Sequence, residues 1–238
     1  MKIFSLTLAF LLFTLFGSGP ALAAEPDVHG EVQRLQEEWA AIFYQQPEDQ
    51  HAARFKELLG KVHTLSERYP QSAEALALEG VVLCTYAGSD IGFSVLRKVK
   101  QARELFEKSI TLDPRALDGT AYVALGNLYH RLPGWPISFG NDNAARQYFT
   151  AAQKMFPDAI DTNYFYGDFL LSEGEFEQAL YYLEKADKAV IRSETQISDL
   201  QLKTEVAEAL ADARARNDDR SDFFTRLIPS FGGDSSSP

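Results

Sequence analysis

Large apolar residues recur three or four positions apart along most of the chain, a spacing that places them on one face of an α-helix. In the first two such segments, residues 28–45 and 52–69, they stand at Val32, Leu35, Trp39, Ile42, Phe43, Phe55, Leu58, Leu59, Val62 and Leu65. A proline follows at position 70, and proline cannot continue a helix. We therefore predict a pair of helices over residues 28–70.

Three later segments share one order of small and large residues. In the clearest of them the order is Leu125, Gly126, Tyr129, Ala145, Phe149, Ala152 and Pro157. The corresponding residues are Glu79, Gly80, Leu83, Ala102, Phe106, Ser109 and Pro114 before it, and Tyr166, Gly167, Leu170, Ala179, Leu183 and Ala186 after it. Small residues let two helices approach closely, and large residues fill the grooves between them. The pattern therefore predicts helix pairs over residues 73–114, 119–157 and 160–192.

This order of residues resembles the tetratricopeptide repeat, a helix A–turn–helix B unit of about 34 residues. The helix A glycines stand at positions 80, 126 and 167, at intervals of 46 and 41 residues. The extra residues lie mainly between Leu83 and Ala102 and between Tyr129 and Ala145, which is between helix A and helix B of one pair. The resemblance implies an all-α fold in which hairpins stack in a short right-handed solenoid, with enlarged loops between helix A and helix B.

Residues 193–216 are predicted to form a C-terminal capping helix. Their apolar residues again follow helical spacing, at Ile197, Leu200, Leu202, Val206 and Leu210. A repeat array needs such a terminal element to cover its last apolar face. Residues 217–238 are polar and rich in glycine and serine, so we expect a disordered tail there. The repeat domain is thus expected to span residues 24–216.

The first residues have the order of a secretory signal peptide. A positive charge at Lys2 precedes an apolar run over residues 6–16, helix breakers within 17–20 and the tripeptide Ala-Leu-Ala at 21–23. We expect cleavage near Ala23 and a soluble periplasmic or secreted protein without an integral membrane segment in the mature chain. The only cysteine is Cys84, so no cysteine follows the cleavage site for lipid attachment.

The charge balance and the absence of catalytic motifs limit the expected functions. A net charge of −11 repels polyanions, so nucleic acid is not an expected partner. Phosphate-binding, nucleophile-elbow and zinc-protease motifs are missing, and the four histidines lack ligand spacing. We therefore expect no enzymatic activity, no cofactor and no bound metal. The enzymatic alternative is a carboxylate pair, Asp161 and Asp168, seven residues apart on one helix face.

An array of helix pairs presents a concave surface lined by helix A of each pair. The residues predicted to face it are Glu74, Ala77, Val81, Cys84, Thr120, Val123, Asn127, His130, Asp161, Tyr164, Asp168 and Leu171. This surface is acidic at one end and partly apolar. Two interpretations stay open: the surface binds a ligand or partner, or it is an ordinary solvated face.

The insertion at residues 132–143 is the second candidate for a binding feature. It places Trp135 and Phe139 in a loop with two prolines and two glycines, and Asn141 or Asp142 can cap the next helix. The segment 161–169 is expected to lie beside it, and we place a binding site between the two; packing over the array is the alternative. The candidate binding residues are Asn127, His130, Trp135, Phe139, Asp161, Tyr164, Tyr166 and Asp168.

A closer resemblance covers roughly residues 70–190 and rests on the insertion at 87–100, the passage 125–136 and the segment 161–170. These pieces resemble the TatT-like T component of tripartite ATP-independent periplasmic (TRAP) transporters, a helical repeat protein with enlarged loops. The resemblance implies a protein partner, namely a periplasmic solute-binding protein, and a small hydrophobic ligand. The lipid anchor common in that family has no counterpart here. The alternative is a general cell-envelope scaffold that binds proteins without a ligand.

Overall fold

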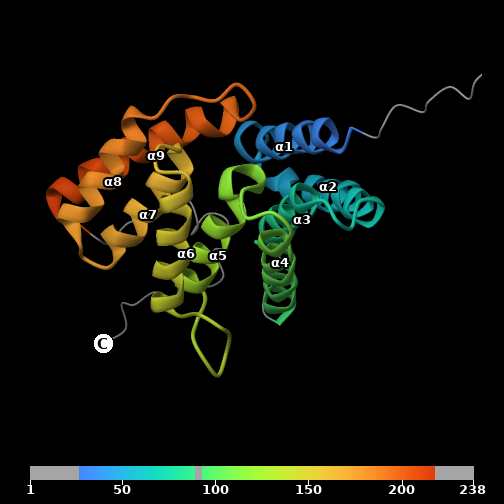
Figure 1. Cartoon of the computed structure of the whole chain (residues 1–238), viewed down its shortest axis with the longest axis horizontal. Helices are drawn as coiled ribbons and strands as arrows, with labels where there is room; N and C mark the ends of the chain where they lie inside the picture. Colours follow the sequence, from blue (N-terminus) through green and yellow to red (C-terminus); the bar gives the residue numbers. More distant parts are fainter. Residues whose placement is uncertain (1–26, 89–92, 218–238) are drawn as a thin grey trace, which may run out of the picture.

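The computed structural model describes residues 27–88 and 93–217, and in these ranges the chain is helical and contains no strand (Figure 1). The all-α prediction is confirmed for this part of the chain. The predicted signal peptide, part of the first insertion and the tail after residue 217 lie outside the described residues. The helices are α1 (Val28–Gln45), α2 (Glu48–Arg68), α3 (Ala73–Ala87), α4 (Phe93–Leu112), α5 (Thr120–Arg131), α6 (Asp142–Met155), α7 (Ile160–Ser172), α8 (Phe176–Lys188) and α9 (Gln196–Ala215), with a short 3₁₀ turn, η1 (Ala116–Gly119), before α5.

Several helices begin or end at the sequence signals that predict them. Helices α2, α4 and α6 each end two residues before a proline, at positions 70, 114 and 157. Three helices begin at a side-chain cap, which satisfies a free backbone N–H of the first turn. Asp27 accepts from Gly30 N before α1, Ser72 accepts from Ala75 N before α3, and Asn141 accepts from Ala144 N before α6. Asn141 is therefore the cap of α6.

Consecutive helices pack as hairpins, and each hairpin packs against the next. The predicted pairing of a small residue on one helix with a large residue on its partner is present in three of them. A Cβ added at Gly80 would lie 2.6 Å from the Phe106 ring, and one at Gly126 would lie 2.7 Å from the Phe149 ring. At both positions the facing ring leaves room for the hydrogen atom of glycine but not for a methyl group.

The last helix, α9, packs against α7 and α8, as predicted for a capping element. It buries Leu202, Val206, Ala209 and Leu210 in the main hydrophobic core. Helix α1 contacts α3 and also α9, so the first and last helices of the array meet (Figure 1). This contact closes one side of the stack.

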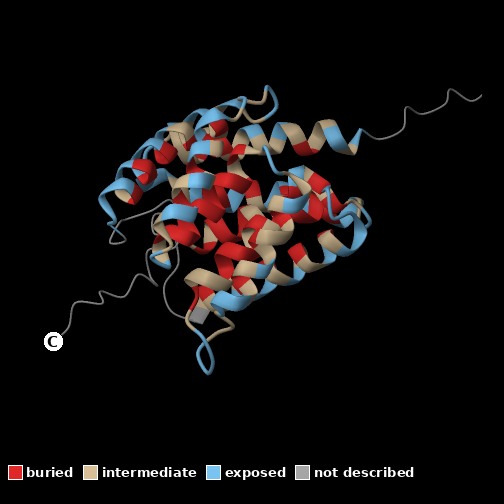
Figure 2. Cartoon of the chain, turned by 60° about the vertical axis from the view of Figure 1, so that its left-hand side comes forward, coloured by how far each residue is buried: buried red, intermediate tan, exposed pale blue. Residues whose placement is uncertain are grey.

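The buried residues concentrate on the helices at the centre of the stack (Figure 2). Helix α7 is the extreme case, because every residue from Thr162 to Leu171 is buried. Helices α5, α6, α8 and α9 all contact it and leave no face open to water.

Within the described residues, no helix is both long enough and apolar enough to cross a membrane.

Candidate functional site

A cavity of about 330 Å³ lies between α1, α3, α5, α7 and the beginning of α9. Most of its wall is apolar, and the apolar lining residues are Trp39, Ala40, Tyr44, Leu78, Val81, Cys84, Phe106, Leu117, Val123, Ala124, Leu128, Phe165, Ile197 and Leu202. Clefts and cavities of this size with apolar walls and few polar groups are typical of small-molecule sites. The cavity exists because α1 and α9 cover what would otherwise be an open concave surface.

Helix α1 is held over the cavity by specific polar contacts. Trp39 Nε1 donates to Thr85 Oγ1 on α3 at 2.9 Å, and the Trp39 ring stacks on Phe43 with centroids 5.4 Å apart. An ion pair between Lys61 and Glu38, 2.7 Å long, joins α1 to α2. The Trp39 ring is thus oriented as part of the cavity wall.

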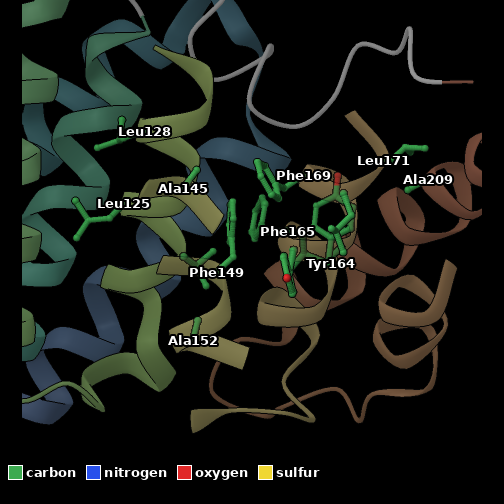
Figure 3. Close-up of a cluster of buried hydrophobic side chains, with 14 of the residues drawn as sticks. Leu125, Leu128, Ala145, Phe149, Ala152, Tyr164, Phe165, Phe169, Leu171 and Ala209 are labelled. Atoms are coloured by element: carbon green, nitrogen blue, oxygen red, sulfur yellow. The ribbon is translucent and has the colours of Figure 1, made fainter. Parts of the chain in front are cut away.

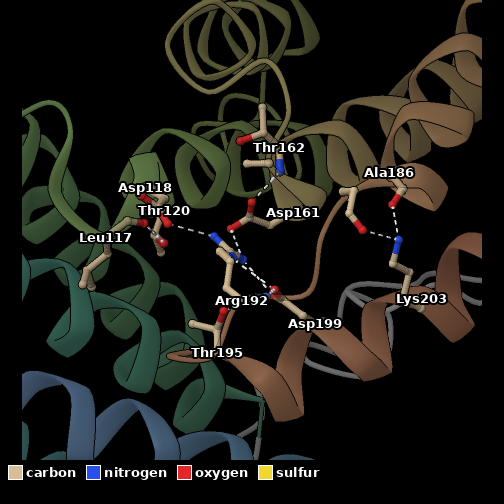
Figure 4. A network of polar contacts seen from close by, with 12 residues as sticks. Leu117, Asp118, Thr120, Asp161, Thr162, Ala186, Arg192, Thr195, Asp199 and Lys203 are labelled. Carbon is tan, nitrogen blue, oxygen red and sulfur yellow. Dashed lines mark hydrogen bonds and ion pairs between the residues drawn. The ribbon is translucent and has the colours of Figure 1, made fainter.

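The polar end of the cavity is organised by Arg192, in the segment that leads into α9 (Figure 4). Its Nε donates to Asp199 Oδ2 at 3.1 Å, and its Nη2 donates to Asp199 Oδ1 at 2.8 Å. Its Nη1 donates to Asp118 Oδ2 at 3.0 Å, and Nη2 also reaches Asp161 Oδ2 at 3.4 Å. One guanidinium therefore joins η1, α7 and α9.

An unusual turn places Asp118 in this network. Leu117 and Asp118 have φ of 47° and 52°, and Gly119 has φ of 78°, so three successive residues adopt the left-handed conformation. Residues other than glycine seldom adopt it, because the side chain crowds the backbone. The ion pair with Arg192 and a 2.6 Å hydrogen bond from Thr120 Oγ1 to Leu117 O hold the turn.

The carboxylates of the network differ in their surroundings. Asp199 is fully buried and accepts from the backbone N–H of Arg192 at 2.9 Å and from Thr195 Oγ1 at 3.1 Å. Burial raises the pKa of the Asp161 carboxyl, although Arg192 and the backbone N–H of Thr162 act in the opposite direction. Burial lowers the pKa of Arg192, but the three carboxylates raise it by more. The guanidinium therefore stays charged.

Six of the residues predicted to face the concave surface line this cavity, and they are Val81, Cys84, Thr120, Val123, Asn127 and Asp161. Two candidate binding residues, Asn127 and Asp161, are thus brought together at one site.

Burial raises the pKa of Cys84 to about 12, so its thiol stays protonated and serves as a small apolar group in the wall.

The Trp135 loop lies elsewhere. Trp135 is 90% exposed and does not line the cavity, and the loop projects away from the helices (Figure 1). Phe139 anchors the loop, with its ring 5.2 Å from that of Tyr129 and under the Arg103 guanidinium at 4.7 Å. Of the two aromatic residues, Phe139 therefore packs over the array and Trp135 faces solvent.

The remaining candidates on α7 are part of the core. Tyr164 is fully buried and lies in the hydrophobic cluster that includes Phe165, Leu171 and Ala209 (Figure 3). Tyr166 packs on Phe149 and Tyr182. The sequence alone did not show that α9 packs against α7, which is why Tyr164 was expected in an open groove, whereas Tyr166 is buried against α6 and α8.

The two α7 carboxylates, Asp161 and Asp168, have different partners. Asp168 pairs with Arg131 at 2.8 Å, whereas Asp161 faces Arg192 at 3.4 Å. Each of the two carboxylates thus lies beside an arginine from a different segment, Arg131 at the end of α5 and Arg192 before α9.

His130 belongs to a small polar cluster outside the cavity. Its Nδ1 lies 2.8 Å from Asp142 Oδ1 and its Nε2 lies 2.9 Å from Ser172 Oγ. Among the described residues, His130, Asp142 and Glu173 form one group whose ligand atoms lie within 4.8 Å of one another. Arg146 lies 3.7 Å from the Glu173 carboxylate, so a positive charge already stands beside this group.

The cavity residues that sequence reasoning missed come from the two ends of the array. They include Trp39, Tyr44, Arg192, Ile197 and Asp199. Both terminal segments were predicted as ordinary amphipathic helices, and their apolar spacing gave no signal for a site. No protein-family model matches the chain, and a comparison with curated proteins finds no match.

Proposed function

We propose that this chain is an exported tetratricopeptide-repeat protein that binds a small, largely apolar ligand in the cavity between α1 and α9. We further propose that it works with a protein partner, a periplasmic solute-binding protein, as an accessory to a solute transporter. The resemblance of residues 70–190 to the T component of TRAP transporters supports the partner. The apolar cavity supports the ligand.

The contact between α1 and α9, which both line the cavity, carries this proposal. A general scaffold that binds other proteins along its concave surface needs that surface open, but here α1 and α9 contact each other across it. About 330 Å³ of mainly apolar space remains inside. Such a space is too small for a folded partner and is suited to a small molecule. The partner would then contact the outer surface of the array.

The proposed ligand is tested by filling the cavity. Ala124 lines the cavity on α5, and Ala124→Phe places a ring inside it. Ala211 is exposed on α9, so Ala211→Phe is a matched control outside the cavity. The mature proteins are purified from the cell envelope, their helical content is compared by circular dichroism, and bound small molecules are identified by native mass spectrometry.

We expect an apolar molecule on the unmodified protein and on Ala211→Phe, but not on Ala124→Phe. A solute-binding protein captured from the same envelope extract supports the transporter role. If no small molecule accompanies any of the three proteins while envelope-assembly proteins are captured, the ligand proposal is wrong and a scaffold is the better description.

A further inference from the structure

The charges that line the cavity are strongly unbalanced. Among the described lining residues, Arg192 is the single cation, whereas Glu37, Asp161, Glu194 and Asp199 carry carboxyl groups. Asp118, which binds the same guanidinium from η1, adds a further carboxylate beside the polar end. The apolar cavity therefore ends in a region of net negative charge.

Arg192 is already engaged by several carboxylates, which limits what it can offer an anionic ligand. All three of its side-chain nitrogens already donate to carboxylates, Nε and Nη2 to Asp199 and Nη1 to Asp118. An incoming carboxylate or phosphate would compete with these bonds and face the three aspartates as well. Like charges at this range oppose binding, most strongly where the site is partly shielded from water.

Asp161, in contrast, can bind a cationic group of a ligand. Among the described residues, one hydrogen bond reaches each of its carboxyl oxygens, from Thr162 N at 2.9 Å and from Arg192 Nη2 at 3.4 Å. A carboxylate oxygen can accept two bonds, so both oxygens keep an acceptor site. Burial raises the pKa of this carboxyl, and a neighbouring cation would relieve that cost of ionisation.

The walls also suit a cation with an apolar body. The rings of Trp39, Tyr44 and Phe165 form part of the lining, and aromatic faces attract organic cations. Aliphatic side chains of α3 and α5, such as Val81 and Val123, offer the apolar surface that a hydrocarbon body would contact.

We infer that the ligand of this cavity is an amphipathic organic cation, with a hydrocarbon body and a protonated amine that lies against Asp161. The inference rests on the proposed ligand-binding function and specifies the chemical class of the ligand. Its physical basis is the combination of an apolar cavity, aromatic walls and one arginine that is bound by several carboxylates.

The two tryptophans of the chain allow a direct test. Trp39 lines the cavity, whereas Trp135 is exposed on a loop outside it. In a Trp135→Phe protein, the remaining tryptophan fluorescence reports on the cavity alone. Decylamine, 1-decanol and decanoate, which share one chain length, are titrated at pH 7 below the concentrations at which they form micelles. A Trp39→Phe protein, which keeps Trp135, is the control and should show no saturable change.

We expect decylamine to bind at least about tenfold more tightly than decanol, and decanoate to bind most weakly, since one partly shielded charge pair changes affinity by about that factor. Asp161→Asn, which keeps the size of the side chain, should remove most of the preference for the amine while decanol binding changes little. Circular dichroism checks that this variant folds. If it does not fold, the comparison of the three probes on the protein that keeps Asp161 still tests the charge preference of the cavity.

The outcomes separate the two proposals. Equal or tighter binding of decanol or decanoate would overturn the cationic ligand but leave the apolar ligand site intact. Saturable binding of none of the three probes would remove the ligand site and this inference with it. Tight amine binding that Asp161→Asn leaves unchanged would show that the amine lies away from this carboxylate, which contradicts the inferred arrangement.

Discussion

At the scale of single residues, contacts between helices depend on glycines that face large side chains. Gly126 faces the Phe149 ring, and a Cβ there would lie 2.7 Å from it. Gly60, on α2, has no atom within 4 Å of an added Cβ. We expect Gly126→Ala to lower the free energy of unfolding by about 1–3 kcal/mol, because the added methyl overpacks the core. Gly60→Ala should raise it by roughly 0.5–1 kcal/mol through helix propensity.

Urea unfolding of the two variants beside the unmodified protein measures this difference. Each change adds one methyl group to a helical glycine, so helix propensity favours both substitutions alike. Similar effects of the two substitutions would mean that the Gly126–Phe149 contact is not as close as described.

Two histidines should respond to pH in opposite directions. The hydrogen bond of His63 Nδ1 with Glu79, 2.7 Å long, raises the pKa of His63, whereas burial lowers the pKa of His130. The stability that His63 contributes is therefore present below its unfolded pKa of about 6.5 and is lost as pH rises through its higher folded pKa. For His130, stability is lost as pH falls through about 6.5 toward its lower folded pKa.

Nuclear magnetic resonance titration of the imidazole protons checks these two directions. We expect the His63 ring to titrate above pH 6.5 and the His130 ring below it, and the substitutions His63→Gln and His130→Gln assign these two signals among the four histidines. Unfolding of the same variants at pH 8 and at pH 5.5 gives the effect on stability. The prediction fails if His130 titrates at the higher pH of the two.

At the scale of elements, Arg192 secures the junction between α9 and the earlier helices. Its bonds reach η1, α7 and the fully buried Asp199 of α9. Arg192→Met should lower the free energy of unfolding by about 1.5–3 kcal/mol, because it leaves the buried carboxylate without its cation. Arg216→Met, at the end of the same helix, breaks an exposed pair with Glu177 and should cost less than about 1 kcal/mol.

Chemical unfolding monitored by circular dichroism compares these two Arg→Met variants. The fluorescence of Trp39 in a Trp135→Phe background adds a local readout, since loosening of α9 admits water to the cavity. Equal stability losses in the two variants would show that the Arg192 network does not secure α9.

At the scale of the whole molecule, the first and last helices of the described residues complete one structure. Helix α9 covers apolar residues of α7 and also meets α1 across the cavity. A protein that ends at residue 193 should therefore unfold at a lower temperature, and its Trp39 emission should shift to longer wavelength. A protein that ends at residue 217 keeps α9 and distinguishes the loss of this helix from the loss of later residues. Identical melting of the two truncated proteins would refute the capping role.

Much of the helical architecture could be predicted because its signals are local. Apolar spacing, the prolines at 70, 114 and 157, and caps such as Asn141 act within a few residues of the helix end that they define. The small-and-large pairs predicted the hairpin contacts, since the residues of one hairpin are near in sequence as well as in space. The same register predicted which positions of α3 and α5 face the concave surface. Val81 and Asn127 are two of these positions, and both line the cavity.

By itself, then, the sequence determined which segments are helical, where they end and which of their faces are apolar, because helix geometry follows from short-range periodicity. Only the tertiary structure decided that α1 and α9 meet, since that contact joins residues far apart in sequence and depends on the packing of every hairpin between them. The same contact turned a predicted open groove into a cavity. The tertiary structure also decided that Tyr164 is buried in the core and that Trp135 faces solvent. It also placed the Arg192 network, which no local pattern encodes, at the polar end of that cavity.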